Sequence, residues 1–414
     1  MAVDTPAKIA ILGAGPIGLE AALYARFLGY EVEIFEQGTV AANVSKWRHV
    51  KMFTPFSMNS TKLGREAIIA QNDAVFPDDD ALLTGSQFVD QYLRPLSETD
   101  LIAGSVREHS RVVAIGKQTL GKSQAIGSSL RADEKFRIQI KSSSDEEEFS
   151  EADIVIDCTG TFSNPRRLGP GGIPAIGENG LRSEIEYGIP DVLGADRDSY
   201  GGKQILVVGA GFSAATTVVA LSNLQSAQPA TQLTWLVRSD SQHPIPVIEN
   251  DQLAERSRLA NEANRLASSD SIQFRKGAYI EEVAKAGDQF HVKIFNGSCS
   301  ESLTVDRIVA NVGYQPDNSI SQELQVHQCY ATEGPMKLAA NLVNDDSADC
   351  LAQQSHGSAS LVTTEPNFYV LGGKSYGRNP HFLLSIGHAQ IRDLFTLIGD
   401  RENLDLYQSI QALS

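Results

Sequence analysis

The stretch IAILGAGPIGLEAALYARFLGYEVEIFE, residues 9–36, decides the fold of this chain. Its apolar start predicts a buried parallel strand that ends at Leu12 and leads directly into a glycine-rich turn. The apolar segment after the turn predicts a helix to about Leu28, and EVEIFE predicts the next strand. A strand, a Gly-x-Gly-x-x-Gly turn and a helix in this order are typical of a dinucleotide-binding unit.

Each position of this turn has its own physical task. Gly13 permits the tight turn, Gly15 lets a pyrophosphate approach the backbone, and Gly18 lets the helix lie close to the strand. Pro16 and Ile17 open the helix, whose free N–H groups and partial positive charge favour phosphates. We therefore expect all five residues to bind a cofactor.

A second stretch, LVVGAGFSAATTVVA at residues 206–220, has the same pattern of strand, glycine-rich turn and helix. The order is again an apolar strand, a Gly-x-Gly turn and a helix, with alanine where the third glycine would stand. The residues expected to bind the second cofactor are Gly209, Gly211, Phe212, Ser213 and Ala214.

The residues that end the second strand of each unit differ in charge. Glu36 ends it in the first unit, where a carboxylate accepts hydrogen bonds from ribose hydroxyls and repels a 2′-phosphate, which favours FAD or NAD. Arg238 holds the equivalent place in the second unit, where a guanidinium can bind a 2′-phosphate, unless it is only a solvated strand end. The pairing predicts FAD at the first site and NADPH at the second.

Together these motifs resemble the flavoproteins with two dinucleotide-binding domains, which include glutathione-reductase-like enzymes, flavin-containing monooxygenases and N-hydroxylating monooxygenases. EADIVIDCTGTFSNP resembles the strand at which such chains leave the FAD domain, and the resemblance implies that Thr159 and Gly160 contact the cofactor. EPNFYVLGGKSYG resembles the second FAD motif and implies the same for Gly372 and Gly373, although Gly373 stands where the family has Asp.

The resemblance implies an α/β protein of two Rossmann-like, three-layer nucleotide-binding domains, the NADPH domain being inserted into the FAD domain. VDRIVANVGYQPD resembles the strand at which the chain returns. We expect a first FAD-binding part at residues 1–165, a linker at 166–199, the NADPH domain at 200–304 and the second FAD-binding part at 305–414.

In this superfamily two segments reach the flavin ring, and here they are residues 44–64 and 372–395. Within the second segment Asn379-Pro380 is expected to open a helix. The alternatives are that the aromatic residues of the first segment belong to the core and that the polar residues of the second lie in a surface loop. The candidate catalytic residues are Trp47, Asn59, Lys374, Tyr376 and Arg378.

The function implied by the resemblance is an NADPH-dependent FAD oxidoreductase, expected to be a single-component monooxygenase that acts through a C4a-peroxyflavin. Its partners would be O₂ and a small nucleophilic substrate. GENGLRSEIEYGIPDVLG lacks the Phe-x-Gly-x-x-x-His signature of flavin-containing monooxygenases, so two alternatives stay open. They are a non-oxygenating NADPH reductase of a quinone or electron carrier, and a redox-sensing module that binds both nucleotides.

Composition excludes several other classes. A formal charge of −16 without a basic cluster argues against nucleic acid, and no apolar run is long enough to cross a membrane. The start of the chain does not resemble a signal peptide, so a cytoplasmic location is the default, and homo-oligomerisation is left open. The four cysteines stand singly, which predicts neither a metal site nor the thiol pair of disulfide reductases.

Overall fold

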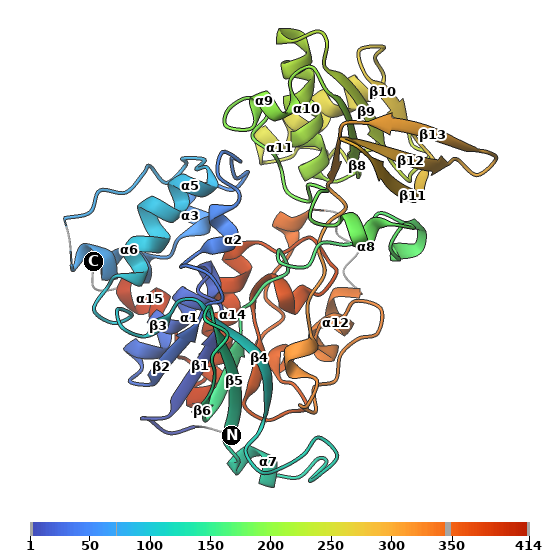
Figure 1. Ribbon diagram of the computed structural model, residues 1–414. Coiled ribbons are helices and arrows are strands. Elements are labelled where there is room, and N and C mark those ends of the chain that lie inside the picture. The colour runs from blue at the N-terminus through green and yellow to red at the C-terminus, as the bar shows by residue number, and fades with distance from the viewer. Residues whose placement is uncertain (1–2, 72, 344–348, 412–414) are drawn as a thin grey trace. The chain divides into compact units, whose positions relative to one another are not determined.

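The computed structural model describes residues 3–71, 73–343 and 349–411 (Figure 1). The chain forms two compact units. The first unit consists of Met1–Lys46, Thr54–Asn164 and Gln315–Ser414, and the second of Trp47–Phe53 and Pro165–Tyr314. Each unit carries its own parallel sheet, which confirms the α/β fold class with two Rossmann-like domains.

The first unit is built on a parallel sheet with the strand order β15-β7-β1-β2-β3. Residues of β1 are paired on both sides, as Ile11 is with Ile34 and with Ile156, and this explains why the strand is apolar throughout. The strands are β1 (Lys8–Leu12), β2 (Glu31–Phe35), β3 (Val106–Arg107), β7 (Ile154–Asp157) and β15 (Phe368–Val370).

Two further layers cover this sheet. Helices α1 (Pro16–Phe27) and α14 (Leu384–Gly399) pack together, and the rings of Tyr24 and Phe395 stack with centroids 5.1 Å apart. An antiparallel sheet of β4 (Ser110–Lys117), β5 (Phe136–Ser142) and β6 (Glu147–Ala152) shares a buried apolar core with β1, β7 and β15. The nucleotide-binding turn after β1 is thus held by a sheet that is packed on both faces.

The remaining elements of the first unit are short. They are α2 (Ala42–Ser45), α3 (Phe56–Asn59), α4 (Lys62–Ile69), α5 (Gly85–Phe88), η1 (Val89–Leu93), α6 (Arg94–Ser97), α7 (Leu130–Asp133), η3 (Ser319–Ser321), α12 (Met336–Val343), η4 (Cys350–Ala352), α13 (Ser358–Leu361), η5 (Gly372–Tyr376) and α15 (Leu406–Gln411).

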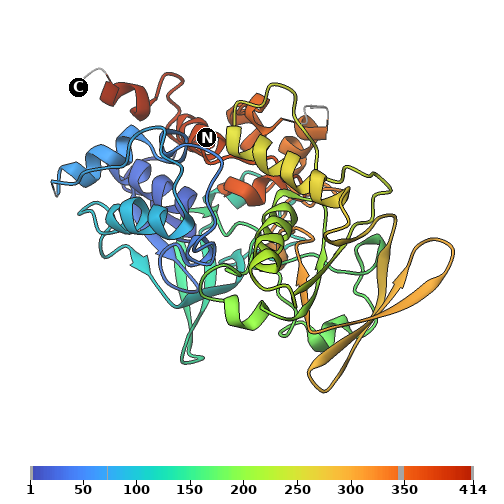
Figure 2. The same cartoon turned by 90° about the horizontal axis from the view of Figure 1, so that it is seen from above.

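The second unit has a parallel sheet with the order β10-β9-β8-β14. Helices α10 (Phe212–Ala227) and α11 (Ala254–Ala267) pack on one face of the sheet, as Figure 2 shows, and an antiparallel sheet shares the core of the other. The strands are β8 (Gln204–Val208), β9 (Gln232–Leu236), β10 (Gln273–Arg275), β14 (Arg307–Ala310) and, in the antiparallel sheet, β11 (Tyr279–Ala286), β12 (Gln289–Phe295) and β13 (Ser300–Val305). The short helices are η2 (Pro170–Gly172), α8 (Glu178–Leu181) and α9 (Arg197–Tyr200).

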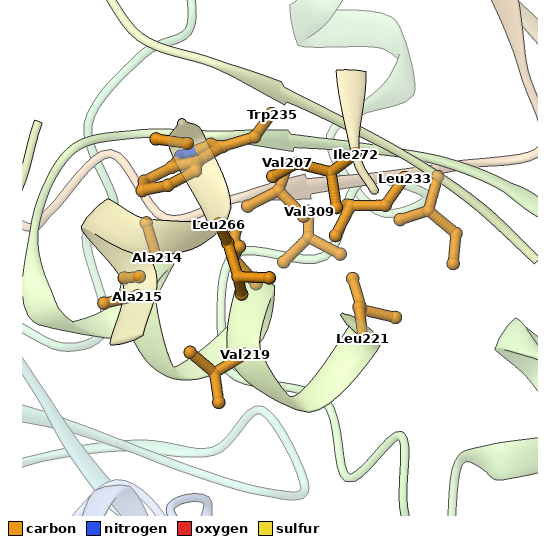
Figure 3. Packing of buried hydrophobic residues seen from close by; sticks show 14 of the residues in the cluster. Val207, Ala214, Ala215, Val219, Leu221, Leu233, Trp235, Leu266, Ile272 and Val309 are labelled. Carbon is orange, nitrogen blue, oxygen red and sulfur yellow. The ribbon is translucent and has the colours of Figure 1, made fainter. Parts of the chain in front are cut away.

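The core between α10, α11 and the second sheet is shown in Figure 3. Val207 and Trp235 point from the strands toward Ala215 and Val219 of α10 and Leu266 of α11. All five side chains are buried. Small residues on α10 let this helix lie close to the sheet, which fixes its N-terminus at the end of β8.

The boundaries between the units differ from those expected. Residues 166–199 belong to the second unit, and β14 pairs with β8, so the chain returns to the first unit after Tyr314 rather than at 305. Trp47–Phe53 also packs with the second unit, where the rings of Phe53 and Phe212 meet edge to face at 5.6 Å. Asn379-Pro380 does not open a helix, because residues 379–383 have no regular secondary structure and α14 begins only at Leu384.

Among the described residues no helix is both long and apolar enough to span a bilayer. The described part of the chain also holds no group of three or more His, Cys, Asp or Glu side chains that could bind a metal ion.

Candidate nucleotide-binding sites

The first glycine-rich turn is closed on one side and open on the other. The Gly13 amide donates to the Phe35 carbonyl at 2.8 Å, and a Cβ at Gly18 would overlap with the Gly13 carbonyl oxygen, so only glycine lets α1 approach β1. Gly15 is the N-cap of α1, and no atom lies within 4 Å of the place where its Cβ would be. The N-terminus of α1, with Pro16 in its first turn, therefore has open space beside Gly15 through which a phosphate could approach its N–H groups.

Glu36 is held at the edge of this space by the turn itself. Its Oε2 accepts the Ala14 amide and its Oε1 accepts the Gly38 amide, each at 2.9 Å. The side chain is only 8% exposed. Each oxygen keeps lone pairs beyond these bonds, so the carboxylate can still accept a ribose hydroxyl.

A buried ion pair joins the two other motifs of the first unit. Lys374 Nζ lies 2.6 Å from Asp157 Oδ2 and 3.1 Å from the Thr159 hydroxyl oxygen. Thr159 in turn donates from its hydroxyl to Asp157 Oδ1 at 2.7 Å. The side chains of Lys374 and Asp157 are 2% and 1% exposed, so the pair is well shielded from water. It fixes the Thr159-Gly160 segment against η5.

A glutamine on α14 holds the second FAD motif from the other side. Gln390 accepts the Gly372 amide through Oε1 at 2.9 Å and donates through Nε2 to the Ser375 hydroxyl at 2.9 Å. Gly372 has a φ of +71°, and Ile17 of the first turn lies within 3.3 Å of where its Cβ would be. Ile17 thus packs against the second motif, and Gly373 follows within η5.

Three of the five candidate catalytic residues have side chains committed to local contacts. Lys374 is paired with Asp157, as described above. Asn59 is buried and exchanges hydrogen bonds of 2.8 and 2.9 Å with Thr54. Arg378 makes two hydrogen bonds of 2.8 Å to the Glu333 carboxylate. These contacts give the three residues a structural reason to be polar.

The other two candidates lie in different surroundings. Tyr376 is 1% exposed and packs with Leu338, Leu342 and Ile386 in a small apolar cluster. Trp47 belongs to the segment that packs with the second unit. A role at the flavin for any of the five remains a prediction.

In the second unit, the turn after β8 has the same geometry. Gly209 has a φ of +133°, and a Cβ there would overlap with the Asn311 carbonyl oxygen. Gly211 is the N-cap of α10, and no atom lies within 4 Å of where its Cβ would be. Ala214 is fully buried, so a methyl group fits where the first turn requires glycine. Phe212 and Ser213 form the first turn of α10.

Asn311 and Arg238 lie on two sides of this turn. Asn311 Oδ1 accepts the Thr217 hydroxyl at 2.8 Å, and its Nδ2 donates to the Gly188 carbonyl at 2.6 Å, so Asn311 ties the end of β14 to α10. Arg238 follows β9 and is exposed. Its guanidinium is therefore accessible to a ligand phosphate.

Sequence reasoning missed Asp157, Gln390 and Asn311. Asp157 had a detectable signal, because a carboxylate that ends the apolar strand IVID needs a partner when it is buried. Gln390 and Asn311 gave none, since an amide on a helix or after a strand is more often exposed.

All four cysteines are free thiols. Cys158 follows β7, and burial together with Asp157 raises the pKa of its thiol well above the usual range. Cys299 is exposed in the second unit, and Cys329 and Cys350 are partly exposed in the first. The chain therefore carries no disulfide.

Residues 10–337 match the pyridine nucleotide-disulphide oxidoreductase family. The chain belongs to this family. Membership in the pyridine nucleotide-disulphide oxidoreductases confirms the expectation of an oxidoreductase and the resemblance on which it rested. No curated protein sequence matches the chain.

Solved structures with similar folds include two reductases and an N-hydroxylase. The bacillithiol disulfide reductase of Bacillus cereus is 17% identical, with a TM-score of 0.69 over 96% of this chain and 99% of that chain. The ornithine N-hydroxylase of Kutzneria sp. 744, solved with reduced FAD, NADP⁺ and L-ornithine, is 16% identical, with a TM-score of 0.63 over 96% of this chain and 100% of that chain. The thioredoxin reductase of T. acidophilum is 16% identical, with a TM-score of 0.58 over 95% and 97%. These likenesses support the two-domain fold.

Proposed function

We propose that this protein is an NADPH-dependent FAD oxidoreductase that acts as a monooxygenase on a small nucleophilic substrate. The observation that carries the oxygenase assignment is the state of the cysteines. A disulfide reductase needs two thiols that exchange with its substrate, and at least one must ionise readily. Here the thiol beside the first nucleotide motif, Cys158, has a raised pKa, and the thiol whose pKa is lowered by its hydrogen bonds, Cys329, lies outside both nucleotide motifs and forms no disulfide.

FAD fits the first unit. The open space at Gly15 suits the pyrophosphate, and Glu36 suits a ribose hydroxyl. Thr159, Gly160, Gly372 and Gly373 are the residues that we propose for the remainder of the cofactor. When bound, FAD supplies the hydride and oxygen chemistry that amino acid side chains lack.

NADPH fits the second unit. Gly211 and the N-terminus of α10 offer amide groups to the pyrophosphate, and Arg238 can hold the 2′-phosphate in a bidentate contact. The contact of Phe53 with Phe212 stabilises the first turn of α10, where these amides lie.

The Asp157–Lys374 pair has a positioning role in this proposal. Lys374 keeps its ammonium beside Thr159, so the two segments proposed to contact FAD are joined by one buried contact. Gln390 restrains the same turn from α14. An oxygenase needs a site that excludes water to avoid wasteful peroxide release, and these contacts hold the segments that we propose for that site.

The test compares three outcomes of NADPH oxidation. The purified protein with FAD is supplied with NADPH and a panel of small amines and thioethers, and O₂ uptake, H₂O₂ and ¹⁸O incorporation into the organic product are measured. A monooxygenase consumes one O₂ per NADPH, and the right substrate lowers the H₂O₂ yield while the product gains ¹⁸O. Rapid anaerobic reduction of a quinone or of a disulfide, without ¹⁸O incorporation in any product, would instead establish a non-oxygenating reductase.

Thiol alkylation provides an independent control. Treatment of the NADPH-reduced protein with N-ethylmaleimide inactivates an enzyme that works through a thiol pair. We expect the NADPH-dependent O₂ uptake of this protein to survive the treatment, because the exposed thiol Cys299 and the partly exposed thiols Cys329 and Cys350 all lie outside both nucleotide motifs.

A further inference from the structure

Three arginines of the second unit, Arg166, Arg167 and Arg182, gather beside the end of β14, and we call them the arginine cluster. Arg166 donates its amide to the Gly313 carbonyl at 2.9 Å and its Nε to the Tyr314 carbonyl at 3.0 Å. Arg182 donates through Nη2 to the Pro165 carbonyl at 3.3 Å. The cluster is therefore attached to the two segments that enter and leave the second unit.

Tyr187 connects the members of the cluster. The Arg182 guanidinium lies over the Tyr187 ring, 5.3 Å from the centroid. The backbone carbonyl of Tyr187 accepts the Tyr314 hydroxyl at 3.0 Å. Burial and the hydrogen bond to Glu178 raise the pKa of the Tyr187 hydroxyl, while the nearby charge of Arg167 opposes this shift. The Arg182 guanidinium thus lies over the tyrosine ring, and the charge of Arg167 lies near enough to act on its hydroxyl.

Two guanidinium nitrogens of the cluster lack a partner. Within the described residues, Nη1 of Arg167 and Nη1 of Arg182 are buried and make no hydrogen bond. A buried charged donor without an acceptor is unfavourable, so such groups are normally matched by an anion or by water. Two of them around one tyrosine indicate a place for an anionic group.

The nearby carboxylates are already engaged. Glu178 is fully buried and accepts the amides of Leu168 and Ala175 as well as the Tyr187 hydroxyl. Glu186 is exposed and accepts the Gly188 amide at 2.6 Å. In the part of the chain that the structure describes, neither carboxylate accepts a hydrogen bond from Nη1 of Arg167 or Nη1 of Arg182. Nη1 of Arg167 and Nη1 of Arg182 therefore stay available to an anionic group of a ligand.

The cluster lies at the ligand-binding edge of the sheet. Glu186 forms a parallel bridge with Val309 of β14, and its amide donates to the Ile308 carbonyl at 3.1 Å. The segment around Glu186 therefore lies beside β14, at the end of the strand order β10-β9-β8-β14. Ligands of such sheets bind at the carboxyl ends of the strands. Tyr187 follows Glu186 at that edge, beyond the turn after β8.

The arginine cluster and the proposed phosphate sites of NADPH lie at different places along this edge of the sheet. Arg238 follows β9, on one side of the β8 turn, whereas Tyr187 and its arginines lie past β14, on the other side. If the adenosine half lies over β9 and the pyrophosphate at β8, the nicotinamide half points toward β14. An anion at the cluster would then belong to the molecule that reacts next to the nicotinamide end.

From this geometry we infer that the arginine cluster binds a carboxylate or phosphate group of the acceptor substrate, which makes that substrate an anionic small molecule. The inference rests on the proposed function for the order of the nucleotide along the edge. The two possible sources of the anion, the substrate and NADPH itself, share the same chemistry, and the experiment below separates them.

The experiment uses inorganic phosphate as the probe. Binding of ³²P-phosphate to the full-length protein with FAD is measured by equilibrium dialysis at constant ionic strength, with saturating NADP⁺ present to fill the nucleotide's own phosphate sites. We expect saturable binding that weakens by about tenfold or more in Arg167→Gln and Arg182→Gln, since each loses a charge-assisted hydrogen bond. Arg167→Lys should restore part of the affinity, because it keeps the charge.

Arg265→Gln is the matched control, because Arg265 is an exposed arginine of the same unit on α11. Circular dichroism and FAD content verify that each variant is folded. Unchanged phosphate binding in both cluster variants would overturn the inference. Loss of NADP⁺ affinity in these variants, with no phosphate bound beside NADP⁺, would also overturn it, by assigning the cluster to the nucleotide. Because the assay involves no turnover, its outcome is independent of whether oxygen is inserted.

Discussion

Lys374 Nζ lies 2.6 Å from Asp157 Oδ2, with both side chains almost fully buried. This contact joins the last residue of β7 to η5 across more than 200 residues of sequence, since the separation of the two residues is 217. Its strength depends on both charges being present, because one buried charge without the other is strongly unfavourable.

We expect Lys374→Met to lower the free energy of unfolding of the first unit by about 3–5 kcal/mol. The same variant should release FAD, because the Thr159-Gly160 segment loses its anchor. Urea unfolding and the FAD absorbance after gel filtration measure the two effects. In the double variant Asp157→Asn/Lys374→Met no charge is left unpaired, so much of the stability should return. If Lys374→Met had the same free energy of unfolding as the wild type, the ion pair would not stabilise the first unit.

The two glycines of the second turn should respond differently to alanine. Gly209→Ala requires a left-handed backbone and overlaps with the Asn311 carbonyl, so it should destabilise the second unit by about 2 kcal/mol or more. Gly211→Ala meets no atom within 4 Å and should leave stability within about 0.5 kcal/mol of the wild type. Its effect should be on the dissociation constant of NADPH, since the methyl group enters the space proposed for the pyrophosphate. Fluorescence titration with NADPH, together with thermal unfolding, separates the two cases.

Arg238→Gln should change the preference between nucleotides. Loss of a charge-assisted contact to the 2′-phosphate is expected to reduce kcat/KM for NADPH by about 10- to 100-fold and to leave the value for NADH nearly unchanged. Steady-state oxidation of both nucleotides gives the ratio, with Arg265→Gln as the control for loss of charge. An equal effect on both nucleotides would remove Arg238 from the 2′-phosphate site.

Glu20 should make stability depend on pH. Its carboxylate is buried on α1, accepts the Thr61 hydroxyl at 2.6 Å and lies 3.3 Å from the Tyr92 hydroxyl oxygen. Burial raises the pKa of Glu20 from 4.5 to about 7. The folded protein thus holds this proton more tightly than the unfolded chain does, so the contribution of Glu20 is full below pH 4.5 and is lost as the pH rises through 7.

The variant Glu20→Gln cannot ionise and should therefore lose this pH dependence. Above pH 8 it should be more stable than the wild type by up to about 3 kcal/mol, a difference that should shrink at pH 5. Urea unfolding at the two pH values tests the sign. A wild-type protein that gains stability between pH 5 and 8 relative to the variant would contradict the raised pKa.

The sequence was sufficient for the local parts of the nucleotide sites. The turns at Gly13 and Gly209 follow from steric rules that act within a few residues, and Glu36 and Arg238 lie at the ends of strands that apolar runs identify. Both sheets and the family could be anticipated for the same reason.

Long-range partners could not be anticipated in this way. The ion pair of Lys374 with Asp157, which is far away in sequence, leaves no local signal around either residue, whereas the prediction that Lys374 lies beside the flavin stays a prediction. The helix expected at Asn379-Pro380 begins at Leu384 instead, although Pro380 is compatible with a helix start. The hydrogen bond from His381 to the Asn379 side chain stabilises a turn there instead.

The contact of Trp47–Phe53 with the second unit has a consequence for dissecting this protein into pieces. A fragment of residues 165–314 would contain the long continuous part of the second unit but would lack seven residues that belong to this unit, Phe53 among them. When this fragment is expressed alone, the Phe212 ring should be exposed to solvent, and the fragment should tend to aggregate. A portable version of this nucleotide-binding module therefore needs a peptide of residues 47–53 supplied in trans or grafted onto one end.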